Sequence, residues 1–427
     1  MEKDDDWNTL LSFFPKNWKK IGIQTGAITR QLRGFKSEED LMRTFLIHLA
    51  CGRSLRETVA RARESGLTQV SDIALFKRLK ASQKWFHEMC LCLISEQNIH
   101  LPTTGIKCRL FDATTVSEPG KTGSLWRIHF SIKIPSFSCD FLKISPNRGV
   151  KTGESLLRFP IQQDDYIIGD RGYSHAVGIR YVAENKAYSL IRLNPANLPL
   201  VDSEGRTIPV LKYLKKIKKT GQTANWKVFV LDPQQKDKPI QGRFCVIRKT
   251  KKAIQLAQKK ARWTSRRKGH QIQKSTLEYA KYFMVFTTFP EEEFTCKEVL
   301  QWYRLRWQIE LVFKRFKSIA QLGHLPKHDT ESSLAWLYGK LFTVILVQKI
   351  TNCANSKIPK ESWRPKSQWR EFSFILHQIQ RAIEPTLSLK DTIQFWREIS
   401  DDLSEPTRKR KYQLDNQNLK KNNESLS

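Results

Sequence analysis

The sequence predicts a mixed α/β protein, in which a strand-rich central part lies between two helical regions. Apolar residues recur at helical spacing through much of the first hundred residues and again after Glu298. The stretch between them contains short runs of β-branched and aromatic residues bounded by turn residues. Three neighbouring strands, a short helix and a further strand at its start are typical of an α/β layer fold.

The N-terminal region, residues 1–105, is expected to be helical and to bind DNA. Leu41 to Cys51 is periodic and apolar, and Ser54 is placed to cap a second helix. Ser71 opens a third helix, where basic residues alternate with apolar ones: Lys77, Arg78 and Lys80. Three short helices of this kind fit a helix-turn-helix, or equally a bundle with a solvated basic face, so both interpretations stay open.

The central region, residues 106–330, begins with strands. Three runs suited to a sheet follow one another: Cys108 to Ala113, Trp126 to Ile134 and Phe137 to Ile144. A short helix from Glu154, which we expect to cap it, leads to a fourth strand over Tyr166 to Gly169. The fifth strand of the core could be Tyr188 to Leu193 or Tyr282 to Thr288.

Residues from about 195 to 280 are predicted to form a β-rich, basic insertion in the central region. Lys212 to Lys219 has five lysines in eight residues, and Arg248 to Lys268 has ten basic residues in 21 and no acid. A solubilising surface is the alternative, but an acid-free stretch of this length favours phosphate contact. We expect three of its cations to bind DNA: Arg266, Arg267 and Lys268.

The C-terminal region, residues 331–405, is again predicted to be helical. Leu334 to Ile350 is apolar nearly all round, which indicates a buried helix. The last segment, residues 406–427, is basic and rich in Asn and Gln, so we expect it to be a disordered tail.

The overall charge points to a polyanionic partner. The 427 residues include 74 Lys and Arg against 42 Asp and Glu, a formal net charge of +32. Such a surplus favours DNA or RNA, because counterions released from phosphates drive the association. The longest nearly apolar run, Leu341 to Val347, is far shorter than the roughly 20 residues of a membrane span, and the acidic start does not resemble a signal peptide. We therefore expect a cytoplasmic protein with no membrane association.

The eight cysteines do not form a recognisable zinc motif. They are scattered, with no C-x2-C pair, and the nine histidines do not supply the missing ligands. Buried or incidental thiols in a reducing cytoplasm are the expected state.

A helix predicted around residue 310 carries the most informative polar group. At about 100° per residue, four side chains fall within roughly 60° of one another: Tyr303, Arg306, Glu310 and Lys317. An apolar stripe that must face a core lies next to them: Leu305, Ile309, Val312, Phe313 and Phe316. Salt bridges on an exposed helix face are the alternative, but convergence beside the buried stripe favours a functional site.

Two aspartates lie where an α/β sheet would present them. Asp112 ends or lies within the first strand, and Asp170 directly follows the fourth. Either alone would be weak evidence, because Asp is common in turns. With Glu310 they make three hard oxygen donors, the kind that Mg²⁺ prefers, and two metal ions held this way can drive phosphodiester chemistry. Other acids are expected to form turns or salt bridges: Asp140, Asp164 and Asp165.

The helix segment Tyr303–Glu310, with Lys317 after it, matches the motif Y-x2-R-x3-E-x6-K. Through it the chain resembles the DDE transposases of bacterial insertion sequences, in the YREK branch, the insertion-sequence-four family with its Tn-five-type members. Asp112–Thr114 and Asp170–Tyr173 resemble the two aspartate motifs of that family. The resemblance covers roughly residues 40 to 350. It implies a ribonuclease-H-like core interrupted by a β-rich insertion, with helical regions before and after it.

The same resemblance implies an enzyme that cleaves the ends of an insertion sequence and joins them to target DNA. Asp112, Asp170 and Glu310 would be the catalytic residues and would hold two Mg²⁺ ions, for which Mn²⁺ can substitute. Water would attack first and free a 3′-hydroxyl, which would then attack the target. The enzyme would act on double-stranded DNA at the bacterial nucleoid and assemble there as a homodimer.

Further roles follow from the resemblance for residues around the motif. Tyr303, Arg306 and Lys317 would hold phosphates of the element's end. Tyr282 stands where related enzymes have an aromatic residue, usually tryptophan, that stacks on a flipped base, and a core strand aromatic is the alternative. Two other functions stay open: a related nuclease that cuts without joining strands, and a DNA-binding protein that has lost catalysis. Intact acids at all three positions argue against the second.

Overall fold

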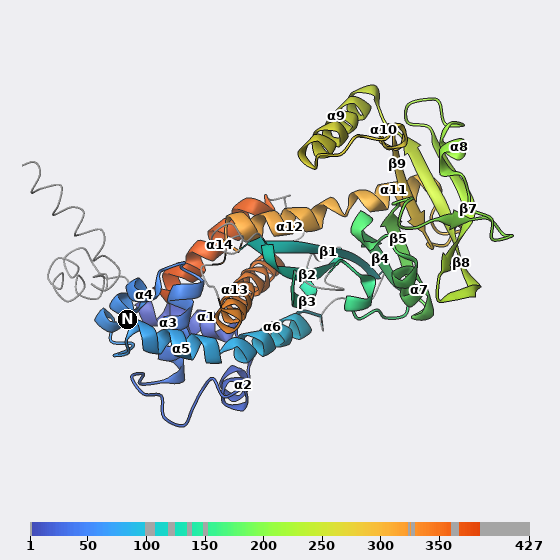
Figure 1. Ribbon diagram of the computed structural model, residues 1–427. Coiled ribbons are helices and arrows are strands. Elements are labelled where there is room, and N and C mark those ends of the chain that lie inside the picture. The colour runs from blue at the N-terminus through green and yellow to red at the C-terminus, as the bar shows by residue number, and fades with distance from the viewer. Residues whose placement is uncertain are drawn as a thin grey trace, which may run out of the picture. The chain divides into compact units, whose positions relative to one another are not determined.

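The computed structural model describes residues 2–98, 107–117, 124–134, 139–147, 153–322, 325, 329–359 and 367–384 (Figure 1). The chain divides into two compact units. We call residues 1–89 with 329–427 the helical unit, and residues 90–328 the sheet unit. The predicted basic tail, residues 406–427, lies outside the described residues, as does residue 385 onward.

The helical unit brings together the two ends of the chain, which the sequence had suggested as separate regions. Its helices are α1 (Glu2–Ser12), α2 (Trp18–Gln24), α3 (Glu38–Leu49), α4 (Leu55–Glu64), α5 (Asp72–Ala81), α13 (Thr330–Ser356) and α14 (Gln368–Ile383). Arg53 Nε lies 2.7 Å from Glu384 Oε1, and Gln380 Nε2 donates to the Ala50 carbonyl over 2.9 Å. Contacts between residues so far apart in the chain cannot be read from local sequence patterns.

Side-chain caps explain where the N-terminal helices begin. Ser37, Ser54 and Ser71 each accept a hydrogen bond from the backbone N–H three residues later. The predicted starts at Ser54 and Ser71 are therefore confirmed. The predicted buried helix is also confirmed, since α13 is buried from Ala335 to Val347. Among the described helices, α13 has the length and apolar composition of a membrane span, but 72% of that window is buried inside the protein.

The sheet unit is built on nine strands. They are β1 (Lys107–Ser117), β2 (Ser124–Ile134), β3 (Cys139–Pro146), β4 (Asp165–Gly169), β5 (Tyr188–Arg192), β6 (Leu200–Val201), β7 (Thr223–Asp232), β8 (Gln235–Arg248) and β9 (Tyr282–Thr287). Their order across the sheet is β3-β2-β1-β4-β5-β9-β8-β7-β6. Strands β1, β4 and β5 are mutually parallel, and every other neighbouring pair is antiparallel.

Helices flank this sheet and join its strands. They are α6 (Gln83–Asn98), which begins in the helical unit, η1 (Leu156–Arg158), η2 (Arg171–Tyr173), α7 (Ala176–Glu184), α8 (Val210–Leu214), α9 (Lys251–Arg267), α10 (Lys274–Tyr279), α11 (Cys296–Arg304) and α12 (Trp307–Ser318). The helix expected from Glu154 is only the single turn η1, and Ser155 rather than Glu154 caps it. That prediction was wrong in both respects.

Both candidates for the fifth core strand are in the sheet. Strand β5 lies parallel to β4, and β9 pairs antiparallel with β5 on one side and with β8 on the other. The insertion strands therefore extend the core sheet instead of forming a separate one. The basic stretch from Arg248 to Lys268, which we expected among short strands, is largely the helix α9, capped by the Thr250 side chain.

All eight cysteines lie within the described residues as thiols and not as disulfides, and four of them are buried. The expected salt bridges of Asp140 and Asp165 are also found, since both carboxylates contact the guanidinium of Arg109 on β1.

Candidate active site

The register of two parallel strands places Asp112 and Asp170 side by side. Leu110 on β1 pairs with Ile168 on β4, and each aspartate comes two residues after its member of that pair. Side chains two residues apart on a strand project to the same face. Asp112 lies inside β1, which runs on to Ser117, while Asp170 follows β4 and caps the turn η2. The sequence pattern thus located both aspartates at one edge of the parallel strands.

Helix α12 covers the face of the sheet from which Asp112 projects. Phe130 on β2, directly opposite Asp112, packs against Phe313 and Phe316 of α12 with ring centroids 5.7 and 5.4 Å away. Figure 1 shows α12 running along β1. The predicted apolar stripe of this helix is therefore buried, and Glu310 is carried into the neighbourhood of the aspartates.

The polar residues around position 310 are not on one continuous helix. Helix α11 ends at Arg304 and α12 begins at Trp307, and Arg306 stands between them as the N-cap residue of α12. Backbone bonds across the junction skip three residues rather than four, as in Arg306 N to Tyr303 O at 3.1 Å. The prediction assumed one continuous helix through these residues. It therefore predicted that Tyr303, Arg306, Glu310 and Lys317 lie near one another, but not the turn at Arg306 that positions them.

Arg306 joins two of the three predicted carboxylates. Its Nη1 lies 3.5 Å from Asp112 Oδ2, and its Nη2 donates to Glu310 Oε1. The side chains of Arg306 and Asp112 are each 13% exposed, whereas that of Glu310 is 36% exposed. The salt bridge between Arg306 and Glu310, four residues apart, was the alternative to a functional site, and it is present. The same arginine also contacts the buried Asp112.

The electrostatic state of Asp112 is unusual for an aspartate. Its pKa is raised to about 7, mainly by burial; Arg306 and the backbone N–H of Ala113 oppose the shift, and the charges of Asp170 and Glu154 add to it. An acid with this shift, surrounded by other acids, is typical of a functional site rather than a structural ion pair.

Glu154 is a fourth carboxylate at this edge, and the sequence did not reveal it. Its Oε2 occupies the space beside Gly172, where an added Cβ would lie 1.7 Å from it and 3.1 Å from Asp170 Oδ1. Its Oε1 lies 3.6 Å from Arg127 Nη1 on β2. Burial first, and then Asp170, raises the pKa of Glu154. Gly172 leaves the room that brings these two acids together, so the signal in the sequence was the glycine after Asp170.

Cations and a tyrosine lie next to these acids. Tyr303 is only 6% exposed and packs on Phe283, and its hydroxyl makes no hydrogen bond within the described residues. Lys317 Nζ donates to the Thr115 carbonyl of β1 over 2.9 Å. Burial lowers the pKa of Lys317 and raises that of Tyr303.

Three further basic residues gather close to Tyr303 and Asp170. Burial and the charges of Arg192 and Arg171 lower the pKa of Lys249 to about 8. The pKa of Arg171 is also lowered, first by burial and then by the charge of Arg192. Tyr303 and Asp170 have the opposite effect and raise it. Their proximity arises from β4, β5 and β8 and could not be seen in the sequence.

The other predicted DNA-binding residues lie at the start of β9 and at the end of α9. Tyr282 is 5% exposed, and its hydroxyl accepts from Arg248 Nη1 over 2.8 Å, so the structure places it in the core of the insertion. Arg266, Arg267 and Lys268 end α9, a helix without a buried residue, and Arg267 lies over the exposed ring of Trp263. These three cations are thus free to meet a partner.

Comparison with known proteins identifies the family. Residues 143–346 match the family model described as Transposase DDE domain, a span that includes Asp170 and Glu310 and begins after Asp112. The transposase for insertion sequence element IS421 of Escherichia coli is 30% identical over 355 residues, which cover 81% of this chain and 94% of the relative. The chain belongs to the insertion-sequence DDE transposases. Identity to the InsL protein of element IS186A of Escherichia coli K12 is likewise 30%, over 354 residues with the same coverage.

More distant relatives of this transposase align over less of their length. The transposase for element IS231B of Bacillus thuringiensis subsp. berliner is 24% identical over 296 residues, or 63% of this chain and 61% of the relative. The piggyBac transposase in its synaptic complex with hairpin DNA aligns to 93% of this chain and 84% of its own at 11% identity, with a TM-score of 0.43. A score at that level does not establish a shared fold.

The donor set of the transposase is chemically suited to a divalent cation. Asp112, Asp170 and Glu154 bring carboxylate oxygens close together, and Arg306 contacts Asp112. The pKa of Asp112 is raised mainly by burial and, to a smaller extent, by the two neighbouring acids. In the described part of the chain, no three His, Cys, Asp or Glu side chains are already spaced as metal ligands. Glu310 is bound to Arg306 instead, so it would have to exchange that partner to become a ligand.

Proposed function

We propose that this transposase cleaves the ends of an insertion sequence and joins them to target DNA, with Asp112, Asp170 and Glu310 as its catalytic carboxylates. The observation that carries the proposal is the position of Asp112. It is a buried acid in register with Asp170 on the neighbouring parallel strand, and Arg306 links it to Glu310. A structural ion pair would not need two aspartates at the same edge of two parallel strands.

The sheet supports a ribonuclease-H-like core. Its first five strands lie in the order β3-β2-β1-β4-β5, with β1, β4 and β5 parallel and β2 antiparallel to β1. Strands β6, β7 and β8, together with α8, α9 and α10, come between β5 and α12 in the chain, as expected for an insertion before the glutamate helix. The YREK branch agrees with the residues Tyr303, Arg306, Glu310 and Lys317.

Asp112, Asp170 and Glu310 would hold two Mg²⁺ ions, for which Mn²⁺ can substitute, and Glu154 is close enough to Asp170 to assist them. When bound, these ions supply a charge that favours attack by water and stabilises the oxygen that leaves the phosphorus. The first attack breaks a phosphodiester bond and frees a 3′-hydroxyl at the element's end. That hydroxyl then attacks a phosphodiester of the target, forms the new P–O bond and breaks the bond to the target's own 3′-oxygen, which leaves as a 3′-hydroxyl.

The basic residues around the acids would hold the DNA in place. Arg306 and Lys317 flank the carboxylates, and the buried hydroxyl of Tyr303 is free to donate to a phosphate oxygen. Charge-assisted bonds of this kind neutralise phosphates next to the reacting bond. Arg266, Arg267 and Lys268 on α9 would contact the duplex farther away. Double-stranded DNA is the partner, and assembly as a homodimer on the two ends is part of the proposal.

A conservative substitution tests the mechanism. Glu310→Gln keeps the size and nearly the helix propensity of the side chain but removes its charge. We expect Mg²⁺-dependent nicking of a DNA fragment that carries the element's end to fall by at least about 10³-fold, because the three carboxylates act as a unit. Binding of the same fragment in a gel shift should persist. Asp112→Asn and Asp170→Asn should behave alike, and pairs of these changes should cost little more than one.

The control is Glu292→Gln, which changes an exposed glutamate of the same unit. Nicking by Glu310→Gln at a near wild-type rate would show that Glu310 is not the third carboxylate. Adding a target plasmid separates the alternative function, since a nuclease would yield nicked ends without joined product.

A further inference from the structure

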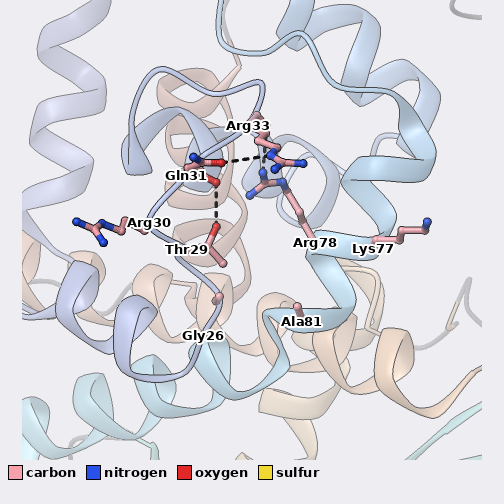
Figure 2. Close-up of a pocket in the computed structure, with 9 residues that line it drawn as sticks. Gly26, Thr29, Arg30, Gln31, Arg33, Lys77, Arg78 and Ala81 are labelled. Atoms are coloured by element: carbon pink, nitrogen blue, oxygen red, sulfur yellow. Dashed lines mark hydrogen bonds between the residues drawn. The ribbon is translucent and has the colours of Figure 1, made fainter.

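A basic pocket lies in the helical unit, far along the chain from the catalytic carboxylates. It is an open cavity of about 560 Å³ between the loop that follows α2 and one side of α5. Four cations line it, two from each wall: Arg30, Arg33, Lys77 and Arg78. Figure 2 shows the loop residues facing the helix across the cavity.

Both walls come from segments without acidic residues. Residues 7–37 and residues 73–87 contain basic side chains but no Asp or Glu. Neighbouring cations that do meet an acid lie outside the pocket: Lys19 pairs with Glu39 at 2.7 Å, and Lys80 with Asp329 at 3.2 Å. Within the described residues, no carboxylate lies at ion-pair distance from any of the four lining cations. The pocket is thus a concentrated positive charge that the protein itself does not neutralise.

The centre of the pocket holds two guanidinium groups next to one another. Arg78 Nη2 donates to the Arg33 carbonyl over 3.0 Å, and its guanidinium lies over the Phe35 ring at 5.4 Å. Arg33 Nε donates to Gln31 Oε1 over 3.4 Å, which holds its side chain beside Arg78 (Figure 2). Burial and the charge of Arg33 lower the pKa of Arg78. Two like charges held together in this way favour an anion between them.

The outer two cations point away from this centre. In Figure 2, Arg30 and Lys77 extend to opposite sides of the Arg33–Arg78 pair. A single small anion would need the cations to converge on one point. A polyanion that crosses the pocket would instead meet a charge at its centre and another on each side, which matches the spacing of a chain of phosphates better than an isolated one.

We propose that this pocket binds the phosphate backbone of DNA, with Arg33 and Arg78 together on one phosphate and Arg30 and Lys77 on its neighbours. The contacts are to phosphate, so they position the duplex without reading its sequence. The proposal rests on the proposed function in that DNA is the partner. It adds a second contact surface, in the helical unit, to the one on α9.

The test compares two matched double variants of the full-length protein. Arg30→Ala/Lys77→Ala removes the two exposed outer cations, and Lys357→Ala/Arg381→Ala removes one exposed lysine and one exposed arginine of the same unit that do not line the pocket. Binding to a 30-base-pair duplex is measured in EDTA over a range of salt concentrations. We expect the pocket variant to lower the log–log salt slope by about 0.9 for each phosphate that it no longer neutralises, and the control to leave the slope unchanged.

A third variant probes the centre of the pocket. Arg78→Lys keeps the charge but loses the planar fork, so it should weaken binding about tenfold or less with little change in slope. Thermal unfolding of each variant shows whether its fold is intact. Equal log–log salt slopes for the wild type and for Arg30→Ala/Lys77→Ala would overturn the proposal. So would a wild type that inorganic phosphate stabilises against heat but whose pocket makes no contact with the duplex.

Different results would contradict DNA binding by this pocket and DNA binding by the protein as a whole. If Arg266→Ala/Arg267→Ala lowers the slope and the pocket variants do not, the pocket is wrong while DNA binding stands. If the wild type shows no salt-dependent binding to duplex at all, the proposed function itself is wrong.

Discussion

Two groups of charged residues share strand β1 and differ in how their charges balance. Arg109 contacts Asp140 at 2.5 Å and Asp165 at 2.8 Å, and all three side chains are at most 5% exposed. Three residues along the strand, Asp112 projects to the opposite face. There one arginine, Arg306, is shared between Asp112 and Glu310, with further acids close by.

The difference separates a closed group of charges from one that opens to solvent. The Arg109 group is closed, because the buried cation meets its acids directly and the Ser131 hydroxyl donates to Asp140. In the Asp112 group Arg306 is shared between Asp112 and Glu310, Asp170 and Glu154 lie close by, and Glu310 is 36% exposed to solvent. A buried carboxylate that keeps its charge is costly unless a cation lies against it.

Arg109→Met should give the largest effect on stability. It leaves Asp140 and Asp165 buried without their cation, so we expect the free energy of unfolding to fall by about 3–5 kcal/mol. Chemical denaturation followed by circular dichroism measures this. The matched control is Arg206→Met, an arginine that also meets two acids, Asp202 and Glu204, but is 69% exposed. Its loss should cost at most about 1 kcal/mol, and equal costs would erase the distinction between closed and exposed groups.

Asp112→Asn should act in the opposite direction in the metal-free protein. Because the pKa of Asp112 is raised to about 7, the folded state binds a proton more tightly than the unfolded chain, and stability falls as the pH rises from about 4 to 7. Asn cannot ionise. We therefore expect this variant to be more stable than the wild type by up to about 4 kcal/mol at pH 8, and by less at pH 5.

The measurement is denaturation in EDTA at the two pH values. Adding Mg²⁺ at pH 8 sharpens the comparison, because a cation that binds only the folded wild type raises its stability. A variant that is destabilised at pH 8 would mean that Asp112 belongs with Arg109 as a structural charge.

Glu154→Gln should give the smallest effect of the three. The residue lies beside Asp170 but is held by Arg127, so its charge assists the site from one side. We expect the Mg²⁺ concentration needed for half-maximal thermal stabilisation to rise by about tenfold or less, as is typical of residues that support a metal ligand. An unchanged midpoint would reduce Glu154 to a partner of Arg127.

Sequence patterns located the strands and the aspartates well, because local signals decide them. The β-branched runs predicted β1, β2 and β4, and the serine caps predicted α4 and α5. The same local view expected a β-rich insertion over about 195 to 280 and did not foresee the helix α9 within it. That helix is amphipathic, but its lysines and arginines surround a narrow apolar stripe with Leu256 and Trp263, both exposed, so its pattern resembles a surface loop.

Other features depended on parts of the chain that no local pattern connects. The segment Trp302–Gln308 has neither the Pro nor the Gly that usually marks a break in a helix. The turn at Arg306 could therefore not be foreseen. Glu154 resembled a helix cap because its nearness to Asp170 depends on the fold around Gly172. Glu310 was predicted as a helix residue, but its salt bridge to Arg306, which also contacts Asp112, required the sheet and the helix to meet.

Strand β9 has a consequence for how the sheet unit unfolds. It joins the core strands to the insertion strands. On one side it is hydrogen-bonded to Leu190–Arg192 of β5, and on the other to Arg243–Arg248 of β8. Because the ladder is continuous across β9, the insertion is not an accessory module that can melt first or be excised cleanly. Removing it would leave β9 as a bare edge open to pairing with other chains. We therefore expect the insertion strands and the strands that carry Asp112 and Asp170 to unfold together in one cooperative transition.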